Sequence, residues 1–278
     1  MEAFLKIGAI TLAFLVVVSS RPAAADTSAS HLARAEALMG KNDLDGAIVE
    51  YRKAIQLRPR GTQAHFELGM ALKVKGKPDE AIAEYREAIR LNPSLAEARV
   101  NIGSILQSKG DLNGAAAEFR EAIRVNPDLA QAHANLGSIL RVKGELDESI
   151  TELHEALRLN PDLAFTHRDL GFVLGLKRDM DGAIKELREA LRLNPGMAEA
   201  HSGLGDAMRA KGDMDGAIKE YHEALNLDPN YALAHYNLAN CLVVKGNKAE
   251  AAREFSEAKR LNPKLRIAPP EIHNRKPQ

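Results

Sequence analysis

The chain has 278 residues, of which 45% are hydrophobic, 27% are charged and only 4% are aromatic. Basic and acidic side chains are equal in number, at 38 each, so the formal net charge is zero and neither nucleic acid nor an anionic membrane surface is an expected partner. The single cysteine excludes an internal disulfide, and a single compact domain of this length would need more large apolar residues for one deep core.

The first 25 residues have the layout of a secretory signal peptide. A positively charged start precedes an apolar run over 7–18, and Ala23-Ala24-Ala25 supplies a small-residue cleavage site. The apolar run is shorter than the about 20 residues that a membrane span needs. We predict cleavage after Ala25, a periplasmic or secreted mature chain, and no membrane contact after cleavage. The alternative is an uncleaved signal that anchors the chain in the inner membrane.

The sequence repeats itself every 34 residues. Prolines mark the period at Pro59, Pro93, Pro127, Pro161, Pro195, Pro229 and Pro263. Seven copies follow one another without insertion or deletion, over 28–61, 62–95, 96–129, 130–163, 164–197, 198–231 and 232–265. A fixed period of this size is typical of a solenoid, in which each unit packs only on its neighbours. The domain is therefore expected to span 26–265.

Each repeat is predicted to form two antiparallel helices. In the second repeat, Leu68 and Leu72 lie on one helical face, and a second apolar stripe runs over 81–91. Between the two stripes stands a glycine that is expected to be left-handed and to end the first helix, at Gly76, Gly110, Gly144, Gly212 and Gly246. An Asn-Pro pair ends the second helix, because proline disfavours helical geometry in the residue before it.

Polar residues near each turn are predicted to cap the helices. For the second helix of a repeat the candidates are Asp111 or Asn113 in the third repeat and Asp179 or Asp181 in the fifth. For the first helix of the next repeat the candidates follow the proline, at Ser94, Asp128, Asp162 and Asn230.

The repeat resembles the tetratricopeptide repeat. That family's Leu-Gly pair is matched at 68–69, 102–103, 136–137, 170–171 and 204–205, with Ile102 in place of Leu in the third repeat. Its aromatic residue is matched by Tyr51, Tyr85, Phe119, Tyr221 and Phe255, with Leu153 and Leu187 in the other two repeats. The resemblance covers 28–265 and implies an all-α fold, an α-solenoid in which antiparallel helix pairs form a right-handed superhelix.

The ends of the array are more polar than its middle. Arg34, Lys248 and Lys259 stand where most other repeats carry Leu, Ile or Met. Terminal repeats have one face without a neighbour, so these substitutions favour a monomer over stacking of the ends into fibres or dimers. The tail over 266–278 contains three prolines and is expected to be flexible.

Two sets of chemically capable side chains are predicted to be structural. Six histidines recur at the fourth place of the repeat, at His31, His65, His133, His167, His201 and His235. Packed helices lie about 8–10 Å apart, whereas zinc binds its ligands at about 2 Å, so we expect packing here and no metal site. Cys241 occupies a column of small apolar residues and is expected in the core. No catalytic or cofactor motif is present, so an enzyme is not predicted.

The resemblance assigns the concave surface to places 2, 5, 6, 9, 12 and 13 of each repeat. Place six carries Glu67, Asn101, Asn135, Asp169, Gly203 and Asn237. This column is similar to the asparagine ladder of the repeat domain in O-linked N-acetylglucosamine transferase, whose amides hold an extended peptide. An amide suits that role because it both donates and accepts hydrogen bonds. The alternative is that these are ordinary solvated surface residues.

Aromatic and basic residues accompany that column. Phe66, Phe165, Phe172 and Tyr236 are expected to expose apolar area on the inner face, beside Arg141, Arg168 and Arg209. Exposed aromatic residues next to arginines are typical of binding hot spots. The resemblance therefore implies a scaffold or adaptor that binds a protein or peptide in its concave groove, and the signal peptide implies that it is exported. The alternative is an accessory subunit that presents substrates to a separate enzyme, such as a glycosyltransferase or a secretion complex.

Overall fold

The computed structural model describes residues 27–265, and the predicted signal peptide over 1–25 and tail over 266–278 lie outside the described residues. The regular elements of this part are fourteen helices. The first helices of the seven repeats are α1 (Ser28–Gly40), α3 (Thr62–Val74), α5 (Ala96–Ser108), α7 (Ala130–Lys143), α9 (Ala164–Leu176), α11 (Ala198–Ala210) and α13 (Ala232–Val244). The second helices are α2 (Leu44–Leu57), α4 (Pro78–Leu91), α6 (Leu112–Val125), α8 (Leu146–Leu159), α10 (Met180–Leu193), α12 (Met214–Leu227) and α14 (Lys248–Leu261).

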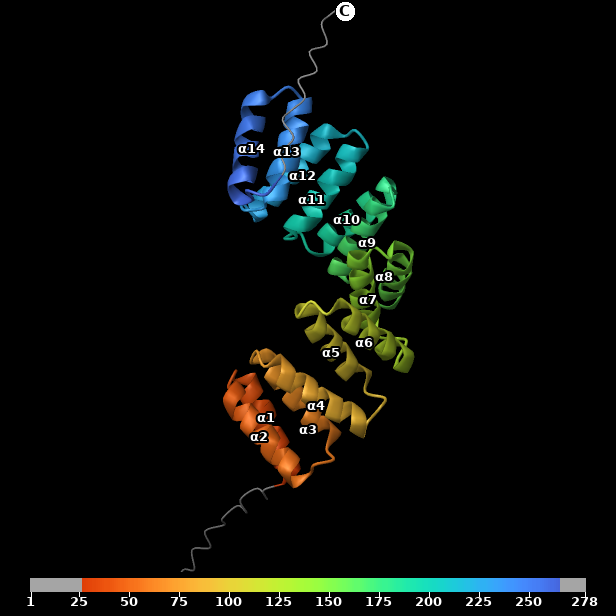
Figure 1. Ribbon diagram of the computed structural model, residues 1–278, viewed down its shortest axis with the longest axis vertical. Helices are drawn as coiled ribbons and strands as arrows, with labels where there is room; N and C mark the ends of the chain where they lie inside the picture. Colours follow the sequence, from red (N-terminus) through yellow and green to blue (C-terminus); the bar gives the residue numbers. More distant parts are fainter. Residues whose placement is uncertain (1–26, 266–278) are drawn as a thin grey trace, which may run out of the picture.

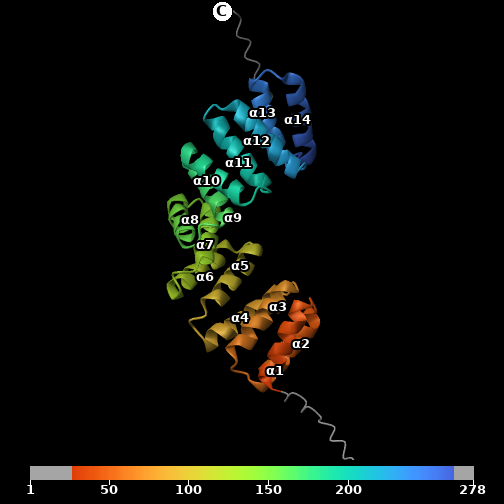
Figure 2. The same ribbon diagram turned by 180° about the vertical axis from the view of Figure 1, so that it is seen from behind.

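The helices stack in sequence order as a solenoid. Each odd-numbered helix packs on the even-numbered helix of its own repeat, and each even-numbered helix packs on the first helix of the next repeat. The stack advances from α1 and α2 at one end of the molecule to α13 and α14 at the other and curves along its length (Figures 1 and 2). The predicted α-solenoid of helix pairs is confirmed.

The turn within each repeat needs one residue in the left-handed region. The five predicted glycines have φ between 77° and 87°, as expected from the ease with which glycine adopts positive φ. In the first and fifth repeats, Asn42 (φ 59°) and Arg178 (φ 66°) take that conformation. Asparagine tolerates it better than most residues, whereas an arginine there is unusual.

The predicted caps of the second helices are correct, and those of the first helices are wrong. Asp111 and Asp179, rather than their alternatives, accept hydrogen bonds of 2.9 Å from the backbone N–H groups of Gly114 and Gly182. By contrast, α5 begins after Leu95, with no side-chain cap. The polar residue after the proline instead donates its own backbone N–H to the side chain before the proline. The four such pairs are Ser94 to Asn92, Asp128 to Asn126, Asp162 to Asn160 and Asn230 to Asp228.

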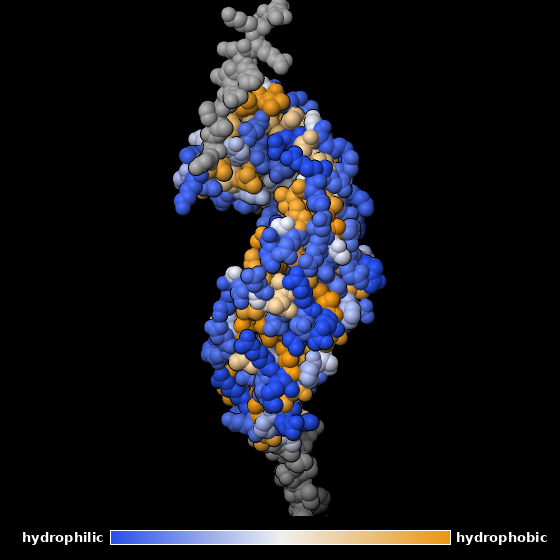
Figure 3. Space-filling model, turned by 45° about the vertical axis from the view of Figure 1, so that its right-hand side comes forward, coloured by the Kyte–Doolittle hydropathy of each residue, from blue (hydrophilic) through white to orange (hydrophobic). Residues whose placement is uncertain are grey.

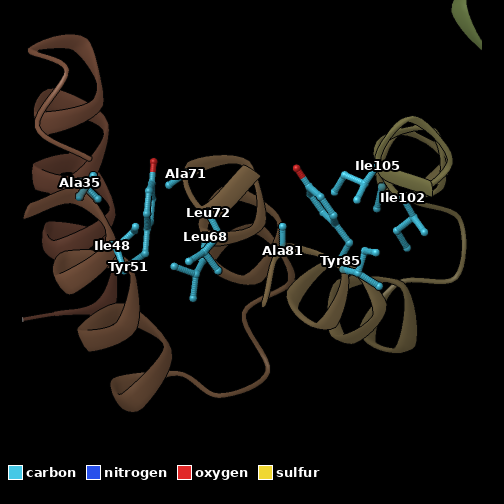
Figure 4. Close-up of a cluster of buried hydrophobic side chains, with 13 residues drawn as sticks. Ala35, Ile48, Tyr51, Leu68, Ala71, Leu72, Ala81, Tyr85, Ile102 and Ile105 are labelled. Atoms are coloured by element: carbon cyan, nitrogen blue, oxygen red, sulfur yellow. The ribbon is translucent and has the colours of Figure 1, made fainter. Parts of the chain in front are cut away.

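The core is a thin layer of side chains between neighbouring helices. Figure 4 shows Tyr51 and Tyr85 standing between helix pairs, with Leu68 and Leu72 between them. Gly69 makes room for the second ring, since a Cβ atom at Gly69 would lie 2.7 Å from Cε1 of Tyr85. The same close approach recurs at Gly103, Gly137, Gly171 and Gly205. These glycines set the spacing of the two helices in the second to sixth repeats.

The histidine column forms hydrogen bonds as well as packing contacts. In six repeats Nδ1 of the histidine lies 2.5–2.7 Å from Oε2 of a glutamate 19 residues later, on the second helix. In five of them Nε2 also lies 2.9–3.3 Å from the proline carbonyl of the preceding repeat. In these five repeats both ring nitrogens therefore lie within hydrogen-bond distance of an acceptor. In the third repeat Arg99 contacts Glu118 at 3.4 Å instead.

Other structural predictions are confirmed. Cys241 is fully buried in a hydrophobic cluster, and burial raises the pKa of its thiol, so it behaves as a small core residue. At the two ends of the array, Arg34, Lys248 and Lys259 are exposed, as expected for faces without a neighbouring repeat.

Candidate functional site

The odd-numbered helices from α5 to α13 form the inner side of the curve, called the inner face below. Successive members contact one another across repeats (α5 with α7, α7 with α9, α9 with α11, α11 with α13), so they lie closer together than a simple stack of pairs requires. The space-filling view shows the molecule hollowed on one side near the middle of its length (Figure 3). Orange hydrophobic patches there are interspersed with hydrophilic residues.

A recess of about 610 Å³ lies between α9 and α11, called the α9–α11 recess below. Its walls come from four successive repeats: Arg141 of α7, Phe172 and Leu176 of α9, Gly203, Asp206 and Arg209 of α11, and Tyr231 and Leu233 at the start of α13. It therefore exists only because of how consecutive repeats are placed.

Gly203 shapes this recess. The second to fifth repeats and the seventh carry an amide or a carboxylate at this place. Here the ring of Phe172 takes the space, and a Cβ atom at Gly203 would lie 2.4 Å from Cε1 of Phe172. The glycine that interrupts the predicted ladder thus allows an aromatic ring to lie across the inner face.

Arginine side chains stack on the aromatic rings beside the recess. The Cζ atom of Arg141 lies 5.7 Å from the ring centroid of Phe172. Arg168 lies between two rings, with its Cζ 5.1 Å from the centroid of Phe165 and 5.9 Å from that of Phe172. These distances are within the range of cation–π attraction. Phe165 is 61% exposed, so this cluster presents both apolar area and positive charge to solvent.

A hydrogen-bonded carboxylate lines the α11 side of the recess. Oδ1 of Asp206 accepts hydrogen bonds from the hydroxyl of Tyr221 at 2.7 Å and from the amide of Asn237 at 2.9 Å, and it lies 3.8 Å from the guanidinium of Arg209. Burial raises the pKa of Asp206 against the opposing effect of these donors. Oδ1 of Asp206 is thus engaged within the protein.

The structure brings together the part of the predicted site that lies in the fourth to sixth repeats. Arg141, Phe165, Arg168, Phe172 and Arg209 form one continuous surface around the recess. The aromatic residues of the other repeats expose less than predicted. Phe66 and Tyr236 are only partly exposed, because they pack on Tyr85 and Phe255 at centroid distances of 5.7 and 5.8 Å.

The rungs of the predicted ladder differ from one another. Asn101 and Asn135 are partly exposed and accept hydrogen bonds from Lys73 at 2.6 Å and from Gln131 at 2.7 Å. Asp169 and Asn237 are only 5% and 8% exposed and bond to neighbouring side chains. Glu67 is partly buried, and burial together with the charge of Glu36 raises its pKa. Asn101 and Asn135 are therefore the rungs most open to a ligand.

The sequence interpretation missed Leu233 and Tyr231 as walls of the recess. Leu233 occupies place two, one of the columns assigned to the concave surface, so its position in the repeat could have predicted that it lines the site. Tyr231 precedes the first turn of α13 and carries no such signal. Within 27–265, no group of three or more His, Cys, Asp or Glu side chains is placed to hold a metal ion.

Family models described as tetratricopeptide repeat match residues 32–96, 100–164, 176–220 and 232–265, and one described as TPR repeat matches 205–246. The chain belongs to the tetratricopeptide repeat family. None of the curated proteins compared with it matches it significantly. Among the helices described, none is both long and apolar enough to cross a membrane.

Several solved structures are similar over most of their own length. YrrB, "a TPR protein with an unusual peptide-binding site", is 26% identical over 65% of this chain and 93% of its own, with a TM-score of 0.55. A crystal structure of MamA is 25% identical over 59% of this chain and 95% of its own, with a TM-score of 0.53. PilF of Pseudomonas aeruginosa, at 22% identity, 73% and 93% coverage and a TM-score of 0.65, shows the fold alone.

Proposed function

We propose that this chain is a non-catalytic scaffold or adaptor that holds a segment of a partner protein on its inner face. The observation that carries the proposal is the surface around the α9–α11 recess, where Phe165 is exposed and arginines stack on aromatic rings in a hollow of the molecule. Exposed aromatic and arginine side chains in a concavity are the usual anchors of a protein-binding site. The peptide-binding site named for the similar protein YrrB supports the same use of the fold.

The proposal places the bound segment along the odd-numbered helices. Asn101 and Asn135 are partly exposed and each has an amide nitrogen with no hydrogen bond to another side chain within 27–265, so they are suited to bonding an extended backbone. The ring of Phe165 offers apolar contact further along the same face. A rigid surface of this kind binds by complementarity and requires no reaction step.

The test is affinity capture with the purified mature chain, residues 26–278, as bait in an envelope extract. Two variants run alongside: Phe165→Ala, and Asn101→Ala combined with Asn135→Ala. We expect a specific partner to be captured by the parent chain and lost or reduced with both variants, while circular dichroism shows an unchanged fold. Capture that is equal with all three baits would contradict use of the inner face. A captured enzyme whose activity requires this chain would favour the accessory-subunit alternative.

We also propose that the protein is exported. The support is the arrangement of the first 25 residues, with a charged start, a short apolar run and Ala23-Ala24-Ala25. Intact-mass measurement of the protein from the cell envelope tests this, because cleavage after Ala25 leaves a mature chain that begins at Asp26. A chain of full mass in the membrane fraction would show the inner-membrane anchor instead.

A further inference from the structure

Arg141 has no anionic partner among residues 27–265. Its guanidinium contacts the face of Phe172, and its Nε atom is buried without a hydrogen-bond partner. The neighbouring cations differ, because Arg168 bonds Glu199 at 2.7 Å and Arg209 lies 3.8 Å from Asp206. Arg141 is thus a cation held in place by an aromatic ring at the wall of the α9–α11 recess.

The acidic side chains of the recess are already engaged. Glu199 accepts the hydrogen bond from Arg168, and Oδ1 of Asp206 accepts from Tyr221 and Asn237. A partly desolvated guanidinium with free donors favours a carboxylate, because charge-assisted hydrogen bonds are stronger than neutral ones and the planar guanidinium matches the carboxylate geometry. The recess therefore has capacity for one incoming acidic group.

Apolar surface lies next to that cation. Leu176 and Leu233 line the same recess and are 60% and 44% exposed, although both are large aliphatic side chains. Phe172 continues the apolar wall from Arg141 toward Leu176. An aliphatic or aromatic side chain of a ligand would bury its area there at the same time as a neighbouring carboxylate reaches Arg141.

We propose that the α9–α11 recess selects partner segments in which an Asp or Glu stands next to a large apolar residue, with the carboxylate on Arg141 and the apolar side chain against Leu176 and Leu233. The inference rests on the proposed peptide-binding function and specifies its ligand. The acid is taken as an internal side chain of a segment that extends from the recess along α7 and α5 of the inner face, and a terminal carboxylate is an outcome of the test.

The probe is an array of 13-residue peptides with blocked ends and fixed Ser/Ala flanks, whose two central residues cover all amino-acid pairs. The full chain is compared with Arg141→Gln and with Arg188→Gln, an exposed arginine on the even-numbered helix α10 for which no ion pair is seen within 27–265. We expect the highest signal from pairs that join Asp or Glu to Leu, Ile, Met or Phe. Replacing the acid by its amide, or Arg141 by Gln, should weaken binding at least tenfold, about 1.4 kcal/mol, and Arg188→Gln should bind like the parent chain.

Three results would overturn the inference, and they are separable. Equal binding of acid and amide pairs, unaffected by Arg141→Gln, would show that the groove binds peptides but not through this contact. A preference for a free C-terminal carboxylate, measured with the same peptides left unblocked, would replace the internal acid. If no peptide binds the parent chain while the envelope partner is still captured, the inner face is limited to folded partners. If neither a peptide nor an envelope partner binds, the proposed function itself is removed.

Discussion

The absence of a side chain at five equivalent positions determines how closely the two helices of a repeat approach. At Gly137 an added Cβ atom would lie 2.6 Å from Cγ of Leu153 and 3.2 Å from the carbonyl oxygen of Ser149. The hydroxyl of Ser149 in turn donates a 2.6 Å hydrogen bond to the carbonyl of Gly137 inside the protein. Backbone and side chain are both fixed here, so a larger residue has nowhere to move.

We predict that Gly137→Ala lowers the free energy of unfolding by about 1–3 kcal/mol, the usual cost of overpacking a core. Gly40→Ala is the matched control, because nothing lies within 4 Å of a Cβ atom at the end of α1 and alanine favours the helix by about 0.5–1 kcal/mol. Urea unfolding followed by circular dichroism measures both. A Gly137→Ala variant as stable as the control would show that the helices can separate at small cost.

The pairing of the two helices within a repeat depends on the histidine–glutamate contact as well as on packing. In the fifth repeat both partners are nearly buried, with His167 9% and Glu186 8% exposed and 2.7 Å between Nδ1 and Oε2. Burial opposes a charged ring, but the hydrogen bonds to Glu186 and to the Pro161 carbonyl outweigh it and raise the pKa of His167. The hydrogen bond from His167 is the main cause that lowers the pKa of Glu186, and Lys185 adds to it.

These directions give a pH window. A raised histidine pKa contributes stability below the unfolded value of about 6.5, and that contribution is lost as the pH rises through the folded value. A lowered glutamate pKa contributes stability above the ordinary value of 4.5, and that stability is lost as the pH falls through the folded value. We predict that His167→Gln costs about 2 kcal/mol between about pH 4.5 and 6.5, and less as the pH rises through the folded pKa of His167. Melting temperatures of both proteins over pH 4–9 test this, and a difference independent of pH would contradict it.

A single charge in the seam between repeats should disrupt neighbouring elements together. Leu136 is 1% exposed and belongs to a cluster with Phe119 and Leu140 that joins α6 to α7. We predict that Leu136→Asp destabilises the chain by at least about 3 kcal/mol, because the carboxylate is buried without a partner. Val142→Asp on the same helix is the control, since Val142 is 59% exposed. Near-native unfolding of Leu136→Asp would mean that this seam does not hold the middle of the array together.

The elements could be predicted from the sequence more fully than the contacts between them. The 34-residue period indicates all the helix pairs, and in five of the seven repeats a glycine before the second helix indicates the turn. The histidine–glutamate pairs could not be predicted, because they join two helices across 19 residues and depend on how those helices face each other. The caps expected after the prolines were wrong because the helices begin one residue later, so that the N-cap position falls on Leu95, Leu129, Leu163 and Tyr231.

At the scale of the whole molecule, curvature decides which residues form a site. The sequence indicated each arginine and phenylalanine separately as a candidate binding residue. Arg141, Phe172 and Arg209 come from three repeats, and whether they lie around one recess depends on how those repeats are rotated. The site also requires Gly203, because the ring of Phe172 occupies the space that a side chain at position 203 would need. Exposed ion pairs also join successive repeats, as between Lys109 and Asp79 at 2.5 Å and between Lys177 and Asp147 at 2.6 Å, although each contributes at most about 1 kcal/mol.

Photo-crosslinking in living cells tests most directly whether the partner binds on the inner face. A photoreactive phenylalanine is placed at Phe165 on the inner face or at Lys185 on α10. Phe165 is 61% exposed and the Lys185 side chain 82%, so both sites are accessible. We expect a crosslinked partner protein from position 165 and none from position 185. Crosslinking from position 185 alone would contradict this expectation and would place the binding surface on the even-numbered helices.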